Sequence, residues 1–508
     1  MIPSVSRRAV LAGSAASAML PFLRARAQTR TPGVLTFGLS SFPPSIQPWA
    51  NTGTAAATIK LMIYRGLTSY APDGSLRGEL AESWGRAGDT GWEFKLRDAR
   101  FQNGEKVTSA DVKWTIEQIA AERSTAYFRA EMQGVERVET PDDRTVRIIM
   151  KNPVATLPVW MASYHLPIIS RSSARGQFVG AGPFMIKAQE RGVSIDLEPF
   201  NGFFREGLPK LKGIRAIAYA DENLRVAALR SGDVDLIEYV PWQFMDAITA
   251  DNELKLDTVD GAFMFLVFNG SRPPFNDPRV RKAVGHAVKR DELVRAAFFG
   301  RGSPLQQLPV AESSAFYNPE FKDGWRYDPD LAKRLLREAG HANGISCSLL
   351  STAQYGMHKD TAEVVQQHLA AVGINAELNL PDWATRVAIG NRGQYELAVM
   401  GTAADSNDPD GIANFIDGSL APSYVRSYGL KIDRITELLA AGRAEFDDAK
   451  RKAIYREMEG VAIEQAPIIG LTWRSQGYAM RRQVSGFKNL PGALTFYSGL
   501  TFETTGIA

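Results

Sequence analysis

Few side chains in this 508-residue chain have the types and spacing that catalysis or metal binding requires. The five histidines are His165, His286, His341, His358 and His368, and only the last two lie close in sequence. A zinc site needs three or four convergent ligands, so we expect these histidines to have surface or core roles. The sequence contains no G-x-S-x-G turn, no phosphate-binding G-x-x-x-x-G-K-[ST] loop and no H-E-x-x-H pair. We therefore expect no cofactor and no metal, and we favour binding over catalysis.

The single cysteine, Cys347, excludes an internal disulfide. It lies in residues 344–350, Gly-Ile-Ser-Cys-Ser-Leu-Leu, which is typical of a β-strand. We expect a buried, inert thiol.

Residues 1–27 have the three parts of an export signal. Arg7-Arg8 opens a basic region, a short apolar stretch follows, and Ala25-Arg26-Ala27 has the form of a cleavage site. The arginine pair favours twin-arginine export. Val10 and Ala12 depart from that pattern, so the general export route stays open. The apolar stretch is shorter than the roughly 20 residues that a spanning helix needs.

The charge of the chain changes once this segment is removed. The formal charge of +3 includes four arginines within residues 1–27 and no acidic residue there, so the mature charge is +3 − 4 = −1. A nearly neutral chain lacks the excess of basic charge that attracts the phosphate groups of nucleic acid. We expect a periplasmic protein that is not embedded in a membrane and does not bind nucleic acid.

Strand-like and helix-like segments alternate along the mature chain, which predicts an α/β fold. Short β-branched or aromatic runs predict strands at residues 33–37, 92–96, 146–150, 214–219 and 263–268. Asp277-Pro278 and Asp328-Pro329 each precede apolar residues at helical spacing, which predicts two helices capped by the aspartates. A third helix is predicted to begin at Ser109.

Several motifs occur in one order along the chain. They lie at residues 80–84 (LAESW), 92–97 (WEFKLR), 101–105 (FQNGE), 108–116 (TSADVKWTI), 180–184 (GAGPF), 228–237 (ALRSGDVDLI) and 273–283 (PPFNDPRVRKA). Together they resemble the bacterial extracellular solute-binding proteins of family 5, the peptide, nickel and related group that serves ATP-driven importers. The resemblance extends from about residue 33 to residue 490.

This resemblance implies a two-lobed periplasmic binding protein fold (type II, cluster C-like) with an extra α/β domain inserted in the first lobe. The expected segments are the signal at 1–27, first lobe at 28–70, inserted domain at 71–179, first lobe again at 180–268, second lobe at 269–475 and a first-lobe return at 476–508. The implied function is capture of a peptide or another amine-bearing solute between the lobes and delivery to the membrane permease of an ABC importer. We expect a monomer.

The family's cleft loops fall on a small set of residues in this chain. Residues 401–410 match a turn whose aspartate pairs with the ligand's α-amino group in peptide-binding members, and Asp405 occupies that position. The alternative role for Asp405 is to form the turn itself. Turn formation is the role that we favour for Asp408 and Asp410. Ligand contacts are expected from Asp405, Asn407, Trp383, Arg386, Phe42, Ser41 and Trp473. A ligand carboxylate and solvent are alternative partners for Arg386 and for Arg474.

One stretch departs from the dipeptide binders. They carry a carboxylate-clamping arginine near the start of the helix after the Cys347 strand, whereas residues 351–359 read STAQYGMHK. Longer peptides, amines, opines, sugars and metal chelates remain possible ligands. A secreted sensing protein and an α/β hydrolase remain alternative functions.

Overall fold

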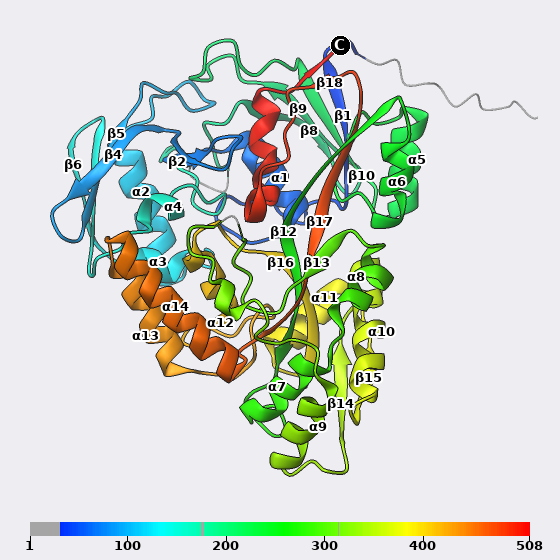
Figure 1. Cartoon of the computed structure of the whole chain (residues 1–508). Coiled ribbons are helices and arrows are strands. Elements are labelled where there is room, and N and C mark those ends of the chain that lie inside the picture. The colour runs from blue at the N-terminus through cyan, green and yellow to red at the C-terminus, as the bar shows by residue number, and fades with distance from the viewer. Residues whose placement is uncertain (1–30, 174–176, 313) are drawn as a thin grey trace, which may run out of the picture.

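The computed structural model describes residues 31–173, 177–312 and 314–508. It is a mixed α/β structure built on one large sheet (Figure 1). The strand order is β15 (Ile374–Asn379), β14 (Ile345–Leu350), β16 (Leu397–Ala403), β12 (Leu254–Phe268), β17 (Ile469–Arg481), β11 (Leu236–Ile237), β1 (Val34–Leu39), β10 (Gly213–Ala218), β9 (Ser194–Pro199) and β8 (Phe184–Glu190), and β13 (Gly302–Pro304) pairs with β17.

Two long strands run through both halves of this sheet. β12 and β17 pair from Leu254 opposite Arg481 to Leu266 opposite Ile469, with irregular register after Asp260 and after Met264. We call strands β1 and β8–β11 the first lobe, and strands β14–β16 the second lobe. Figure 1 shows β12 and β17 crossing from one lobe to the other, so these two strands form the physical connection about which the lobes can move.

A separate four-stranded antiparallel sheet packs at the side of the first lobe (Figure 1). Its order is β4 (Ala81–Ala87), β5 (Gly91–Leu96), β7 (Thr145–Met150) and β6 (Val135–Asp142). Helices α2 (Ser109–Ala120) and α3 (Arg129–Gln133) belong to it. Phe94, Ile116 and Ile148 are buried in its own hydrophobic core, as expected for a unit that alternates apolar and polar residues.

The remaining helices cover the two lobes. On the first lobe and near the crossing strands lie α1 (Thr54–Ile63), α5 (Glu222–Ser231), α6 (Met245–Thr249) and the 3-10 helix η5 (Gly492–Glu503). On the second lobe lie α7 (Pro278–Ala287), α8 (Arg290–Phe298), α9 (Pro329–Glu338), α10 (Gly356–Ala370), α11 (Trp383–Asn391), η4 (Pro409–Ile412), α12 (Ala413–Ile416), α13 (Asp433–Ala444) and α14 (Asp448–Gln465). Shorter elements are β2 (Thr68–Tyr70), β3 (Leu76–Gly78), α4 (Leu157–Trp160), η2 (Trp242–Phe244), η3 (Pro319–Phe321), β18 (Val484–Ser485) and β19 (Gly506–Ile507).

The helix starts read from the sequence are confirmed. Asp277 accepts a hydrogen bond from the amide of Arg279 at the start of α7, and Asp328 accepts one from the amide of Leu331 at the start of α9. α2 begins at Ser109. The five predicted strands are also present, as β1, β5, β7, β10 and β12. β12 begins nine residues before the expected Phe263, because the polar stretch that precedes it pairs with β17.

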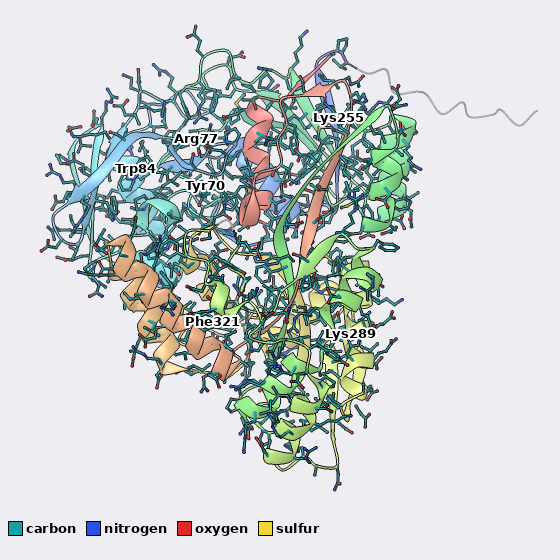
Figure 2. All side chains as sticks on the ribbon, in the orientation of Figure 1. Tyr70, Arg77, Trp84, Lys255, Lys289 and Phe321 are labelled. Carbon is teal, nitrogen blue, oxygen red and sulfur yellow. The ribbon has the colours of Figure 1, made fainter. Side chains whose placement is uncertain are left out.

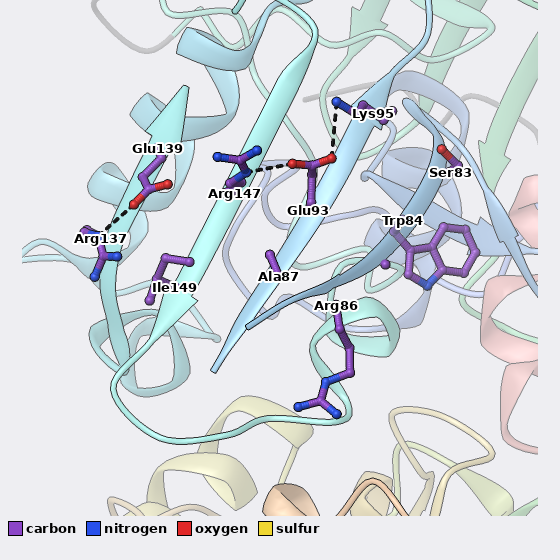
Figure 3. Close-up of a pocket in the computed structure, with 11 residues that line it drawn as sticks. Ser83, Trp84, Arg86, Ala87, Glu93, Lys95, Arg137, Glu139, Arg147 and Ile149 are labelled. Atoms are coloured by element: carbon purple, nitrogen blue, oxygen red, sulfur yellow. Dashed lines mark hydrogen bonds and ion pairs between the residues drawn. The ribbon is translucent and has the colours of Figure 1, made fainter. Parts of the chain in front are cut away.

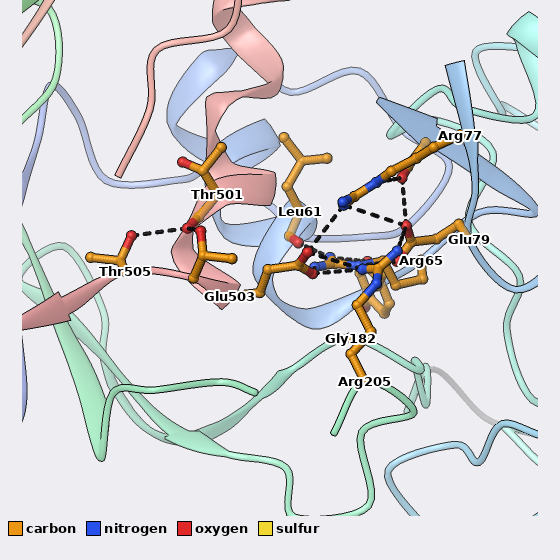
Figure 4. A network of polar contacts seen from close by, with 12 residues as sticks. Leu61, Arg65, Arg77, Glu79, Gly182, Arg205, Thr501, Glu503 and Thr505 are labelled. Carbon is orange, nitrogen blue, oxygen red and sulfur yellow. Dashed lines mark hydrogen bonds and ion pairs between the residues drawn. The ribbon is translucent and has the colours of Figure 1, made fainter. Parts of the chain in front are cut away.

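A buried network of charges ties the C-terminal helix to the first lobe (Figure 4). Arg65 lies 2.8 Å from Glu79 and 2.9 Å from Glu503, and Arg205 lies 2.7 Å and 2.8 Å from the same two carboxylates. Nearby, Tyr70 lies beside η5 (Figure 2), with its ring centre 5.3 Å from that of Tyr497. The chain's C-terminal segment is thereby held by charge pairs as well as by apolar packing.

Three sequence expectations have different outcomes. Cys347 is buried in β14 as expected, and burial raises the pKa of its thiol to about 12. The export signal lies outside the described residues, and the segment boundaries of the lobes remain predictions. No helix within the described ranges has the length and apolar character to cross a membrane.

Candidate functional site

Asp405 lies in the loop that follows β16, where the second lobe meets the first lobe and its side domain. The hydroxyl of Tyr127 donates to Asp405 Oδ2 at 3.0 Å, and Asn414 Nδ2 donates to the same oxygen. The hydroxyl of Tyr497 donates to the backbone carbonyl of Asp405 at 3.0 Å. These contacts come from three separate parts of the chain, so the structure is closed around Asp405.

The carboxylate of Asp405 has no cationic partner among the described residues. Its two acidic neighbours each have a cationic partner: Asp410 lies 2.7 Å from Arg443, and Asp408 lies 2.7 Å from Arg451. Burial raises the pKa of Asp405 to about 6, although the hydrogen bonds from Tyr127 and Asn414 act in the opposite direction. Asp408 also accepts from the amide of Asp410 at the start of η4, so both neighbours shape the turn.

The space beside Asp405 is small in this closed arrangement. A cavity of about 40 Å³ is lined by Asp405, Asn414, Trp160 and other residues of the side domain and the second lobe. Such a volume holds water molecules or one small terminal group of a solute, such as an ammonium group.

Asn407, whose contact with ligand remains a prediction, joins two segments of the protein in this structure. Its side-chain oxygen accepts from the amide of Ala493 at 2.9 Å, and its Nδ2 donates to the carbonyl of Pro491 at 3.3 Å. These bonds connect the loop after β16 to the start of η5 and so stabilise the closed arrangement.

An aromatic cluster surrounds Trp383 at the start of α11. The ring centre of Trp383 lies 5.5 Å from Tyr355, 5.5 Å from His358 and 5.9 Å from Tyr424. The contacts with Tyr355 and Tyr424 are edge-to-face, at 77° and 89°. The Cζ atom of Arg386 lies 5.5 Å from the ring centre of Trp383, so the cluster also contacts a buried cation.

Four tyrosines lie beside this cluster or beside Asp405. Tyr127, Tyr164, Tyr355 and Tyr424 all retain accessible surface, yet burial raises the pKa of each hydroxyl. Tyr355 and Tyr424 contact Trp383, and Tyr127 donates to Asp405. The ring centre of Tyr164 lies 5.0 Å from that of Tyr497, whose hydroxyl donates to the backbone of Asp405.

Arg386 and Arg474 are fully buried, which corrects the solvent alternative that the sequence left open. Arg386 Nη2 donates to the carbonyl of Val399 at 2.6 Å, and Arg474 Nη1 donates to Gln476 at 2.8 Å. Burial lowers the pKa of Arg386 to about 10 and also lowers that of Arg474. A lone buried guanidinium is costly, so its surroundings matter for function.

The other expected ligand residues lie apart from Asp405. Phe42 lines a separate groove of about 1040 Å³ together with Gln102 and Phe178 of the side domain. Ser41 is half-buried in the preceding turn, beside Ser40, whose hydroxyl donates to Glu238 at 2.7 Å. Trp473 packs against the ring of Phe263 at 5.7 Å. Arg386 thus lies beside Trp383, and Phe42 lines a different cavity from Asp405.

The tyrosines at 127, 164, 239 and 424 were not singled out from the sequence. They are isolated aromatic residues in loops or at element ends, far apart along the chain. No spacing marks them, because only the closed fold brings them together.

A second large hollow lies on the outer face of the four-stranded sheet (Figure 3). Its volume is about 720 Å³. Arg147 lies 2.6 Å and Lys95 3.2 Å from Glu93, Arg137 lies 2.9 Å from Glu139, and the Cζ atom of Arg86 lies 4.0 Å from the ring centre of Phe446. Because both carboxylates are already paired and Arg86 packs on a ring, we assign this face no ligand. Within the described ranges, no group of three or more His, Cys, Asp or Glu side chains is placed to hold a metal.

Comparison with known proteins gives a consistent family. The model of the bacterial extracellular solute-binding proteins, family 5 Middle, matches residues 75–422. The glutathione-binding protein GsiB of Escherichia coli (strain K12) is 26% identical over 478 residues, which cover 90% of this chain and 91% of GsiB.

Two solved structures of A. tumefaciens R10 proteins are also similar. The periplasmic binding protein AgaA in complex with agropinic acid has a TM-score of 0.89 and 37% identity, covering 94% of this chain and 99% of AgaA. The binding protein MoaA in complex with mannopinic acid has a TM-score of 0.81 and 25% identity, covering 94% of this chain and 100% of MoaA. Both show the two-lobed fold expected from the sequence, and the members of this family are substrate-binding proteins rather than enzymes. The chain therefore belongs to the bacterial extracellular solute-binding proteins of family 5, and it is a periplasmic solute-binding protein of an ABC importer.

Proposed function

We propose that this protein captures a small amine-bearing solute between its lobes, with Asp405 as the partner of the ammonium group, and releases it chemically unchanged to the permease. The observation that carries the proposal is the state of Asp405: a desolvated, partly accessible carboxylate without a cationic partner in the described structure. Its neighbours Asp408 and Asp410 are already paired with arginines. A ligand ammonium supplies the missing charge, and the dry cleft strengthens the interaction.

The same contacts explain how binding couples to closure. Tyr127 and Tyr497 reach Asp405 or its backbone from outside the second lobe, and Asn407 binds the start of η5. A solute held by Asp405 touches both sides of the cleft only when the lobes close. Its binding therefore favours the closed form, which the permease recognises.

Two observations favour an amino-acid derivative over a free dipeptide. Residues 351–359 supply no arginine for the carboxylate clamp of the dipeptide binders. The relative at 37% identity holds agropinic acid rather than a peptide. Trp383 and its neighbouring rings fit the non-polar or sugar-like portion of such a solute.

A binding assay with matched amines tests the proposal. Ligand-free protein, obtained by unfolding and refolding, is titrated calorimetrically with amine-bearing solutes and with their N-acetylated forms. We expect the free amines to bind and to raise stability by about 2.7 kcal/mol at 100-fold excess over Kd. Asp405→Asn should weaken this binding strongly, whereas the exposed control Asp89→Asn should leave it unchanged. Equal binding of acetylated and free amines, or turnover of any solute, refutes the proposal.

A further inference from the structure

Two buried arginines carry charge that no carboxylate of the described residues balances. Arg386 on α11 and Arg474 on β17 have no exposed surface. Nε of each, and Nη2 of Arg474, are buried without a hydrogen-bond acceptor. Both charges, after burial itself, lower the pKa of His358, so all three groups share one region of the second lobe. An unpaired charge with unused N–H groups indicates a missing anionic partner.

An unused Nε also occurs at Arg65, Arg129 and Arg215, so this feature alone does not single out a site. Fully buried arginines elsewhere have partners: Arg290 donates to five backbone carbonyls, and Arg65 is paired with Glu79 and Glu503. Arg386 and Arg474 combine full burial and unused N–H groups with the lack of a carboxylate partner among the described residues.

A tyrosine ring lies against each of these arginines. The Cζ atom of Arg386 is 5.6 Å from the ring centre of Tyr424, and that of Arg474 is 5.9 Å from the ring centre of Tyr239. Both tyrosines keep accessible surface, whereas the arginines have none. A cation against the ring makes the phenolic hydroxyl a stronger hydrogen-bond donor.

The backbone of Tyr239 is held in a strained conformation. Its φ is 50°, in the left-handed region that bulky residues avoid. Arg225 Nη2 donates to the carbonyl of Tyr239 at 2.8 Å, and the ring stacks on Phe496 at 5.9 Å. Strain of this kind persists where it places a side chain for a purpose.

We propose that the solute carries an acid group, held by the hydroxyls of Tyr239 and Tyr424 with the charges of Arg386 and Arg474 behind them. The inference rests on the proposed function, because it assigns the second end of the same cleft. Asp405 is proposed to hold the ammonium group, so a solute that carries both an ammonium and an acid group would use both sites. Glu238, a carboxylate near Tyr355, does not fill this role, because it already accepts from Ser40 and Thr58. The two A. tumefaciens R10 relatives also hold acids.

The test compares carboxylic acids with their primary amides on ligand-free protein. Agropinic acid, mannopinic acid and glutamate serve as probes, each with its amide, in calorimetric titrations. We expect each acid that binds to bind at least tenfold more tightly than its amide. Arg474→Met and Tyr239→Phe should each weaken acid binding about 10- to 100-fold and weaken amide binding by a smaller factor. Equal affinities for acid and amide, or an Arg474→Met variant that binds acids as tightly as wild type, overturn the proposal.

A stability measurement on the same variants does not depend on the choice of probe. Arg474→Met removes an unpaired buried charge, so we expect its ligand-free Tm to rise. Arg290→Met removes a buried guanidinium that donates to backbone carbonyls, so the Tm of this variant should fall. A fall for both variants contradicts the acid subsite and gives Arg474 a structural role.

Asp405→Asn separates this inference from the proposed function. If the variant loses amine binding while acids and amides bind alike to wild type, the proposed function stands and the acid subsite is wrong. If the variant keeps full affinity and the preference for acids, the acid subsite stands and the amine anchor is wrong.

Discussion

Replacing Asp405 by asparagine separates the charge of this residue from its hydrogen bonds. Tyr127 and Asn414 both donate to Oδ2, and the amide oxygen of asparagine can accept both bonds in the same place. The variant therefore keeps the shape of the closed loop and removes only the negative charge. We expect it to be more stable than wild type without ligand and to bind amines poorly.

The size of the stability gain follows from the raised pKa. Burial moves the pKa of Asp405 from 3.8 to about 6, which is roughly two units, and each unit corresponds to about 1.4 kcal/mol. Ionised Asp405 thus costs the ligand-free protein at most about 3 kcal/mol. A raised folded pKa gives stability that is complete below about pH 4 and is lost as the pH rises through 6. The variant should therefore gain up to about 3 kcal/mol at pH 7.5 and nothing at pH 3.5.

The assay is urea unfolding of ligand-free wild type and Asp405→Asn across this pH range. The difference in unfolding free energy should appear between pH 4 and pH 7. The reasoning is refuted if wild type is as stable as the variant at pH 7.5, or if the difference does not depend on pH. Asp89→Asn, which alters an exposed carboxylate, should show no such difference.

Three further outcomes are expected. Asn407→Ala removes two hydrogen bonds that hold the closed form, so calorimetry should show ligand affinity about 5- to 30-fold weaker, while the exposed control Asn375→Ala should bind normally. Glu79→Gln should lower the unfolding free energy by about 3–5 kcal/mol near pH 6. Burial alone raises the pKa of Glu79, but the charges of Arg65 and Arg205 outweigh burial and hold the pKa low. The difference in unfolding free energy between wild type and Glu79→Gln should therefore shrink as the pH falls below about 4. A difference that does not change with pH contradicts this. The buried thiol of Cys347 should react with a disulfide reagent at pH 8 only after denaturation, and rapid reaction of the native protein contradicts its placement.

Local signals in the sequence predicted the elements that depend on local chemistry. The Asp-Pro pairs at 277 and 328 start helices because the side chain caps free amides whatever the rest of the fold does. The full length of β12 was not predicted, since its first half is polar and contains Gly261. That half is a strand because β17 supplies its partners, and a partner distant in sequence leaves no local pattern.

The candidate site was predictable only in part. The resemblance selected Asp405 and Trp383; the structure shows a desolvated carboxylate at the first and an aromatic cluster at the second, and their contact with a ligand remains a prediction. Phe42 follows the first strand but faces a different groove, because the loop after β1 turns toward the side domain. Arg474 shows the limit most clearly: an arginine in a strand looks the same in sequence whether it reaches solvent or, as here, remains buried without a partner.

Mass spectrometry of the solute that remains bound through purification would identify the natural ligand. Denaturation releases the ligand from the protein, and the small molecule is then identified. The same extract of Asp405→Asn protein serves as the control. The account predicts one unaltered solute that carries both an amine and an acid group, present with wild type and absent from the variant. A solute without an amine, or one retained equally by the variant, contradicts it.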